Sequence, residues 1–140
     1  MAVLFNSEGV KVPKLPRQTI KKWISLTAEN YQKRVGEVSY IFCSDEEILR
    51  INNQYLNHDF YTDIITFDYT EGDLIAGDIF ISLDTVKSNS EKYKTDYDEE
   101  LHRVIIHGIL HLCGLEDKKP DEEKQMREAE NRALELLKTL

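Results

Sequence analysis

The amino-acid sequence predicts an α+β fold, in which a small mixed β-sheet of about four strands packs with about five helices. Most segments rich in β-branched and aromatic residues precede residue 83, whereas helical periodicity dominates after it. Residues 70–73 form a polar, glycine-containing stretch typical of a hairpin loop. Since 140 residues fit one hydrophobic core, we expect a single domain over residues 1–140.

The first elements are a short strand and an amphipathic helix. Residues 2–5 have the composition of a strand. From Pro16 to about Val35, apolar residues recur at spacings of three and four, which predicts a helix, and Gly36 is expected to end it.

The second strand and helix follow directly. Residues 38–43 are short and rich in β-branched and aromatic side chains, as is typical of a strand. Ser44 followed by Glu47 forms a capping-box signature, which predicts a helix that begins there and runs to about Leu56.

The remaining strands pair as a hairpin, and helices complete the chain. Residues 63–69 and 75–82 predict two antiparallel strands. Helices are then expected at 84–93, at 98–112 and from Pro120 onward. Proline opens the last helix, and acidic residues fill its first turn, where negative charge suits the helix dipole.

Composition and charge limit the classes of function. Apolar residues make up 41% and charged residues 31%, as in ordinary globular proteins. The net charge of −8 argues against broad electrostatic attraction to nucleic acid, although a local basic group or a bound cation still engages phosphate. With no apolar stretch long enough for a membrane span, we expect a cytoplasmic protein. Cys43 and Cys113 are expected to be reduced and buried.

Three residues near the end of the helix at 98–112 predict a catalytic zinc site with one ion. His107 and His111 are four residues apart, so their imidazoles lie on one helix face. Gly114 is able to end the helix with a positive φ and turn the chain back, so that Asp117 supplies the third ligand. Glu116 is the competing donor. His102 faces elsewhere and is not expected to bind the metal.

The residue after His107 bears on the type of reaction. Zinc proteases of the His-Glu-x-x-His type use the glutamate after the first histidine as general base, and that position is Gly108 in this chain. A metal ion still polarises phosphate and activates water, which suits phosphodiester cleavage.

The sequence at this helix resembles the YbeY family of bacterial ribosomal RNA maturation endoribonucleases. The family pattern His-Gly-x-Leu-His-Leu-x-Gly-Tyr-Asp-His is mirrored at residues 107–117 by His-Gly-Ile-Leu-His-Leu-Cys-Gly-Leu-Glu-Asp. A second family segment, Leu-Asn-x-x-Tyr-Arg-x-x-Asp-x-x-Thr-Asp-Val-Leu-Ser-Phe, is similar to residues 51–67, and the family's Gly-Asp-Ile strand is similar to residues 77–79. The resemblance covers roughly residues 38 to 117.

The resemblance implies a single-strand-specific, metal-dependent endoribonuclease that matures the 3′ end of 16S ribosomal RNA and acts in ribosome quality control. Its partners would be ribosomal RNA and the small ribosomal subunit, with no role for DNA or a membrane. Two positions depart from the family. Asp117 replaces a histidine, which makes the site more anionic and leaves manganese as an alternative to zinc. Leu56 replaces an arginine thought to meet RNA.

The remaining polar residues keep open alternatives. His58 and Arg103 are candidates for contacting phosphate. The alternatives are that His58 is an exposed loop histidine and that Arg103 forms a surface salt bridge. Asp63 and Asp78 are assigned no catalytic role, although Asp78 would orient a metal-bound histidine if its strand packs beneath the helix. Two other functions remain alternatives, a zinc metalloprotease and a non-catalytic ribosome assembly factor with a structural metal.

Overall fold

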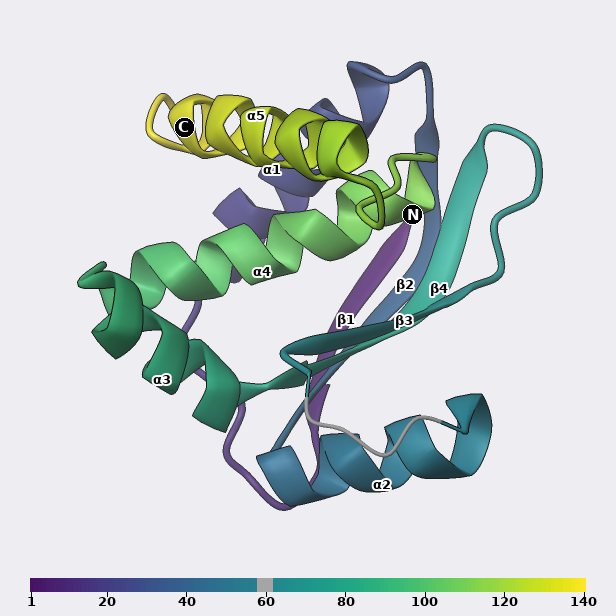
Figure 1. Ribbon diagram of the computed structural model, residues 1–140. Helices are drawn as coiled ribbons and strands as arrows, with labels where there is room; N and C mark the ends of the chain where they lie inside the picture. Colours follow the sequence, from purple (N-terminus) through teal and green to yellow (C-terminus); the bar gives the residue numbers. More distant parts are fainter. Residues whose placement is uncertain (58–61) are drawn as a thin grey trace.

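The computed structural model describes residues 1–57 and 62–140, and these residues form a four-stranded mixed sheet with five helices, which confirms the α+β prediction (Figure 1). The strands are β1 (Ala2–Ser7), β2 (Arg34–Cys43), β3 (Ile64–Asp68) and β4 (Leu74–Ser82), and the helices are α1 (Arg17–Glu29), α2 (Asp45–Leu56), α3 (Leu83–Tyr93), α4 (Tyr97–Leu112) and α5 (Pro120–Leu137).

The sheet has the strand order β1-β2-β4-β3. β1, β2 and β4 run parallel, and β3 pairs with β4 in the antiparallel sense. Tyr40 on β2 and Thr66 on β3 both align with Ile79 of β4. The predicted hairpin of residues 63–69 and 75–82 is therefore confirmed, and β4 lies in the interior of the sheet.

Helices cover both faces of this sheet. α1 and α4 pack on one face, α5 packs on these two helices, and α2 lies across the opposite face, apart from α4 (Figure 1). A large core fills the space between the sheet and α1, α4 and α5, while a small core lies under α2. No helix in the described part of the chain is long and apolar enough to cross a membrane.

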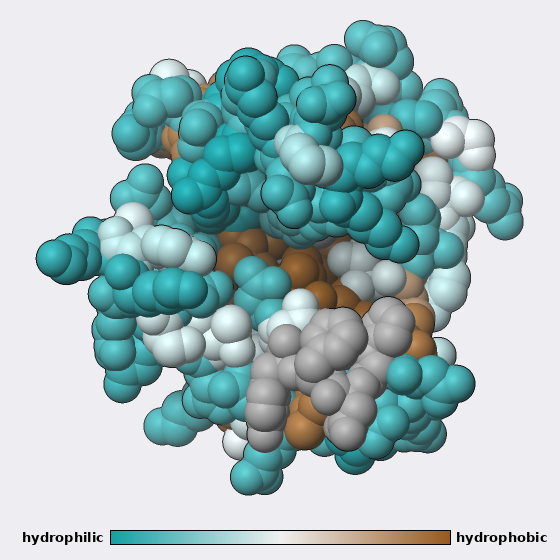
Figure 2. All heavy atoms as spheres, in the orientation of Figure 1, coloured by the Kyte–Doolittle hydropathy of each residue, from teal (hydrophilic) through white to brown (hydrophobic). Residues whose placement is uncertain are grey.

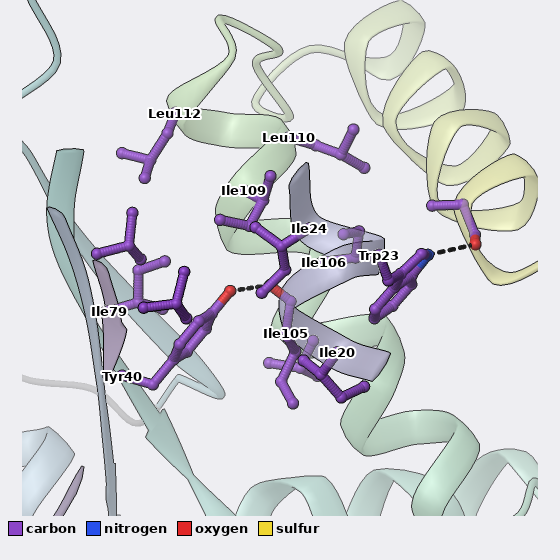
Figure 3. Close-up of a cluster of buried hydrophobic side chains, with 14 of the residues drawn as sticks. Ile20, Trp23, Ile24, Tyr40, Ile79, Ile105, Ile106, Ile109, Leu110 and Leu112 are labelled. Carbon is purple, nitrogen blue, oxygen red and sulfur yellow. Dashed lines mark hydrogen bonds between the residues drawn. The ribbon is translucent and has the colours of Figure 1, made fainter. Parts of the chain in front are cut away.

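Two buried hydrogen bonds join elements around the large core (Figure 3). The hydroxyl of Tyr40 donates to the carbonyl oxygen of Ile105, 2.9 Å away, and so joins β2 to α4. The Nε1 of Trp23 donates to the carbonyl oxygen of Ala133 at 2.6 Å and joins α1 to α5. Each bond gives a buried polar group the partner it needs in an apolar surrounding.

The predicted end of the first helix is wrong. α1 ends at Glu29, and Gln32, with φ of 57°, turns the chain directly into β2. Gly36 lies inside that strand. The strand begins earlier because the backbone amide of Arg34 bonds to the carbonyl of Asp73 at 2.7 Å and because Val35 is buried in the sheet. Pairing with β4 therefore overrides the helical spacing of residues 30–35.

Both cysteines are free and buried, as expected. Burial raises the pKa of the Cys43 thiol to about 12 and that of Cys113 to about 11, because an apolar surrounding disfavours the thiolate. They are small core residues.

Gly108 lets α4 come close to β4. A Cβ placed at this glycine would lie 2.9 Å from Cδ1 of Ile79, 3.1 Å from its Cγ2 and 3.3 Å from Cδ1 of Ile64. Side chains of ordinary size at this position would push the helix away from the sheet.

We expect Gly108→Ala to lower the free energy of unfolding by about 1 to 3 kcal/mol, because overpacking outweighs the better helix propensity of alanine. Ile79→Val should cost about 0.5 to 1.5 kcal/mol. In the double variant, removal of the Ile79 Cδ1 makes room for the new methyl, so the combined loss should be smaller than the sum of the two single losses. Urea unfolding of all four proteins measures this, and additive losses would contradict the close contact.

Candidate metal centre

The two predicted metal-binding histidines lie on α4, whose opposite side is apolar. Asp96 caps the helix by accepting a hydrogen bond from the amide of Glu99, and the side chains of Ile105, Ile106, Ile109 and Leu110 are fully buried. His107 and His111 are only partly buried. Burial of the apolar side thus fixes the direction in which the histidines point.

His102 lies elsewhere, as predicted. Its ring meets that of Trp23 edge to face, with centroids 6.2 Å apart. Burial lowers the pKa of His102, against the opposing charges of Asp98 and Asp96. Its contacts are those of a packing residue.

The turn after α4 returns the chain toward the first histidine. Gly114 has φ of +106°, a conformation that glycine adopts at low cost. The following amide, of Leu115, bonds back to the carbonyl of Leu110. Asp117 then lies with its Oδ2 3.1 Å from Nε2 of His107, whereas the competing donor, Glu116, is exposed. The geometry favours Asp117 over Glu116.

The same turn fixes the ring of His111. Its Nδ1 lies 3.2 Å from the carbonyl oxygen of Leu115, which accepts a hydrogen bond from it. With the proton on Nδ1, the lone pair of Nε2 is available to a ligand.

Two imidazoles and a carboxylate, from His107, His111 and Asp117, are suitable ligands for a divalent metal. Two of these side chains, His107 and Asp117, lie close together. Zinc–ligand bonds of about 2.0 to 2.2 Å in tetrahedral geometry place neighbouring donors about 3.3 to 3.6 Å apart, slightly more than the 3.1 Å between Nε2 of His107 and Oδ2 of Asp117. Within residues 1–57 and 62–140, no group of three or more His, Cys, Asp or Glu side chains is arranged to hold a metal ion as it stands. His111 does not complete the set in this structure.

Glu130 of α5 contacts His107 from the other side. Its Oε2 accepts a hydrogen bond from Nδ1 of His107 at 2.7 Å, and its Oε1 lies 2.9 Å from Nη1 of Arg103. Burial alone would raise the pKa of Glu130, but its bonds to His107 and Arg103 hold it below its usual value. Burial alone would lower the pKa of His107, yet the bond and charge of Glu130, aided by Asp117 and Asp63, raise it.

Arg103 is not in the surface salt bridge that was the alternative to phosphate contact. Its side chain is only 16% exposed and its ion pair with Glu130 is buried. A second donor, Nη2, bonds to the side-chain oxygen of Asn131 at 2.9 Å. Because two of its nitrogens already bond to α5, Arg103 fastens α4 to that helix.

Asp78 does not orient a histidine, so that conditional expectation is wrong. Its side chain accepts a hydrogen bond from the hydroxyl of Tyr69 at 3.4 Å. Side chains alternate across β4, so Asp78 points away from the face on which its neighbour Ile79 meets α4. Glu130 makes the contact that Asp78 was expected to make.

A pocket of about 370 Å³ opens beside His107. Residues of β3, α3, α4 and α5 and the segments before β3 and α5 line it: Thr62, Asp63, Ile64, Asn89, Tyr93, Glu100, Arg103, Val104, His107, Asp117, Arg127 and Glu130. The face shown in Figure 2 is hollowed at its centre, with hydrophobic residues at the bottom of the hollow and hydrophilic residues around much of it. Leu56 is 41% exposed on α2, and His58 and Asp59 lie outside the described residues.

Glu130 was missed at the level of sequence, although a signal exists. It is four residues after Met126 and four before Leu134, both of which are buried. These three positions share one face of α5. A carboxylate at a core position indicates a buried ionic partner, because an unpaired buried charge is costly.

Burial raises the pKa of Asp63, and the charges of Glu130 and Asp117 raise it further against the opposing effect of His107. A carboxyl with a raised pKa in the folded state binds its proton more tightly than in the unfolded chain. Its contribution to stability is therefore complete below the unfolded pKa and lost as the pH rises through the folded one. We expect Asp63→Asn, in metal-free buffer, to match the wild-type free energy of unfolding in acid and to exceed it increasingly as the pH rises toward 7. A difference that stays constant with pH would contradict this.

Comparison with known proteins assigns the chain to a family. Residues 3–138 match the profile of the family described as Endoribonuclease YbeY. Proteins named Endoribonuclease YbeY are similar over nearly their full length: that of Bacteroides fragilis is 58% identical over 138 residues, covering 99% of both chains, and that of Parabacteroides distasonis is 59% identical over 137 residues, covering 98% of this chain and 96% of the relative.

A solved structure agrees with the fold. The solution structure of a Thermotoga maritima protein superposes with a TM-score of 0.68 at 27% identity, and the match covers 96% of this chain and 88% of that one. Together with the profile match and the full-length relatives, this shows that the chain belongs to the endoribonuclease YbeY family.

Proposed function

We propose that this protein is a single-strand-specific, metal-dependent endoribonuclease of ribosomal RNA processing that acts at the 3′ end of 16S ribosomal RNA and in ribosome quality control. His107, His111 and Asp117 hold one zinc ion, residues 1–140 work as one domain, and the site of action is the small ribosomal subunit in the cytoplasm. Membership of the endoribonuclease YbeY family supports the reaction class. The observation that carries the metal site is the approach of His107 Nε2 to Asp117 Oδ2 beside the pocket.

Each proposed ligand has a distinct support. The carboxylate of Glu130 orients His107, the carbonyl of Leu115 orients His111, and the turn at Gly114 carries Asp117. A zinc ion bound there supplies Lewis-acid stabilisation of phosphate charge and a water of lowered pKa. The pocket beside the ligands offers room for the RNA backbone.

The structure weighs against the metalloprotease alternative. In proteases of that type the residue after the first histidine is the general base. Here it is Gly108, which faces Ile79 and Ile64 at the sheet, so a glutamate at this position has no room and does not face the pocket. A hydrolase that relies on this base for peptide bonds is therefore disfavoured.

Arg127 is the arginine of the pocket that is best placed to meet a phosphate. Its guanidinium side chain is 61% exposed and lies 3.9 Å from Glu130, whereas Arg103 is mostly buried and bonded to Glu130 and Asn131. A phosphate contact needs an accessible cation even in a chain of net charge −8. We propose that Arg127 does at this site what the family arginine, replaced by Leu56, does elsewhere.

The metal site is tested by elemental analysis of purified protein, in parallel with cleavage of ribosomal RNA fragments. We expect about one zinc ion per wild-type chain, and its loss together with RNA cleavage in His111→Ala and in Asp117→Ala, because each removes one of three ligands. His102→Ala is the matched control on the same helix and should keep both metal and activity.

Three outcomes would contradict the proposal. A wild-type protein without transition metal would remove the site. A metal that survives both ligand substitutions, in a protein without nuclease activity, would favour an assembly factor with a structural metal. Cleavage of casein without cleavage of RNA would favour a protease.

The role of Arg127 is tested by the salt dependence of RNA binding. Arg127→Ala should weaken binding of single-stranded RNA and reduce the slope of log affinity against log salt concentration by about 0.7, the loss of one phosphate contact. Arg132→Ala removes an exposed arginine of the same helix that does not line this pocket, and it should leave the slope unchanged. Equal slopes in both variants would show that neither arginine meets the RNA in a specific way.

A further inference from the structure

We propose that Glu130 is a positioning residue for the metal site: it holds the proton of His107 on Nδ1 and so leaves the lone pair of Nε2 for a metal ion on the side of Asp117. This inference rests on the proposed function for its metal, but its basis is the contact between α5 and α4. It assigns a role in the site to the last helix of the fold, which supplies none of the proposed ligands.

The carboxylate of Glu130 is held at both of its oxygens. Each oxygen of Glu130 has its own partner, Oε2 with Nδ1 of His107 at 2.7 Å and Oε1 with Nη1 of Arg103 at 2.9 Å. The side chain is only 8% exposed, so few other groups compete for it. A carboxylate with both oxygens engaged is fixed in rotation, and the plane and direction of the imidazole follow from it.

Both ring nitrogens of His107 face a carboxylate, and a carboxylate only accepts hydrogen bonds. The contact of Nδ1 with Glu130, at 2.7 Å, is shorter than that of Nε2 with Asp117, so the single proton of the neutral ring favours Nδ1 and Nε2 keeps the lone pair. Nε2 is the nitrogen that lies 3.1 Å from Oδ2 of Asp117. Metal-binding histidines commonly donate their other ring N–H to a carboxylate or a carbonyl, which fixes orientation and strengthens the ligand.

The two histidines differ in this respect. His111 donates its Nδ1 hydrogen to the backbone carbonyl of Leu115, only four residues away and within the same turn. His107 depends instead on a charged side chain 23 residues away. A carboxylate favours the proton on Nδ1 more strongly than a carbonyl does, so His107 is the stronger and more sensitive ligand.

α5 is packed firmly enough to support the contact between Glu130 and His107. Met126, Ala129, Ala133 and Leu134 are buried on either side of Glu130. The bond from Trp23 to the carbonyl of Ala133 locks the helix to α1. Arg103 balances the charge of Glu130, which keeps a buried carboxylate ionised and acceptor-only at low cost.

The test compares Glu130→Met, which keeps the length of the side chain but has no acceptor, with Glu130→Gln, which keeps a neutral acceptor. Glu128→Met is the matched control, since Glu128 is exposed two residues earlier on the same helix. Because Glu130→Met leaves Arg103 buried without its partner, Arg103→Met/Glu130→Met removes both charges and preserves a folded protein for the comparison.

Two measurements are made on each protein. The first is the zinc dissociation constant from competition with a chelator. The second is the ¹⁵N chemical shift of the His107 ring nitrogens in metal-free protein, at a pH where the ring is neutral. The shifts report which nitrogen carries the proton, and a purely structural role of Glu130 in folding would not move them.

We expect Glu130→Met and the double variant to raise the zinc dissociation constant about 10- to 100-fold and, in the metal-free protein, to shift the ring proton from Nδ1 toward Nε2, which faces Asp117. Glu130→Gln should cause smaller changes in both measurements, because it keeps a neutral acceptor, and Glu128→Met should match wild type. A dissociation constant within twofold of wild type in Glu130→Met, or unchanged ¹⁵N shifts, would overturn the inference. If wild type binds no zinc, the proposed function fails, and the ¹⁵N shifts of the metal-free proteins still decide whether Glu130 sets the tautomer.

Discussion

The close approach of α4 to β4 is the constraint on which the rest of the molecule depends. Gly108 lets the backbone of the helix reach the side chain of Ile79, and the neighbouring isoleucines fill the space on either side. Each fully buried isoleucine is worth about 1.5 to 3 kcal/mol, so turning the helix about its axis would expose several of them at a prohibitive cost. The direction of the histidines is therefore set by apolar burial, before any polar contact is made.

Charged side chains line the pocket beside His107. Four carboxylates, Asp63, Glu100, Asp117 and Glu130, line the pocket with two arginines. Burial raises the pKa of Asp63 and of Glu100, and the charge of Glu130 raises both further. Such a surrounding attracts a cation. A metal ion bound in this pocket would make the local charge positive where the RNA meets the protein, and an acidic chain would then be able to bind a polyanionic substrate.

Much of the fold was predictable from local sequence patterns. Ser44 caps α2 as its sequence predicts, since its side chain accepts a hydrogen bond from the amide of Glu47, although the Glu47 carboxylate bonds to Arg50. The turn at Gly114 has the predicted positive φ. The end of α1 was not predictable in this way, because it depends on pairing between Arg34 and Asp73, which are 39 residues apart.

The contacts of the site also differ in whether they are local in the sequence or join distant segments. The spacing of His107, Gly114 and Asp117 lies within a single helix and turn, so the sequence alone predicted the meeting of His107 with Asp117. The partners of Arg103 and His107 come from a different helix, and spacing along the chain does not encode which helices pack together. The pattern of α5 marks Glu130 as a buried carboxylate, but only the tertiary structure shows that its partners are His107 and Arg103.

The position of Glu130 on the last helix has a consequence for the order in which the site forms during synthesis. A chain that is still being translated contains both histidines and Asp117 before it contains the carboxylate that aligns His107. Until α5 has emerged and docked against Trp23, His107 and Arg103 lack their bonds to Glu130. If Glu130 positions His107 as proposed, the alignment of this histidine is completed only when α5 docks, after all three proposed ligands have been synthesised.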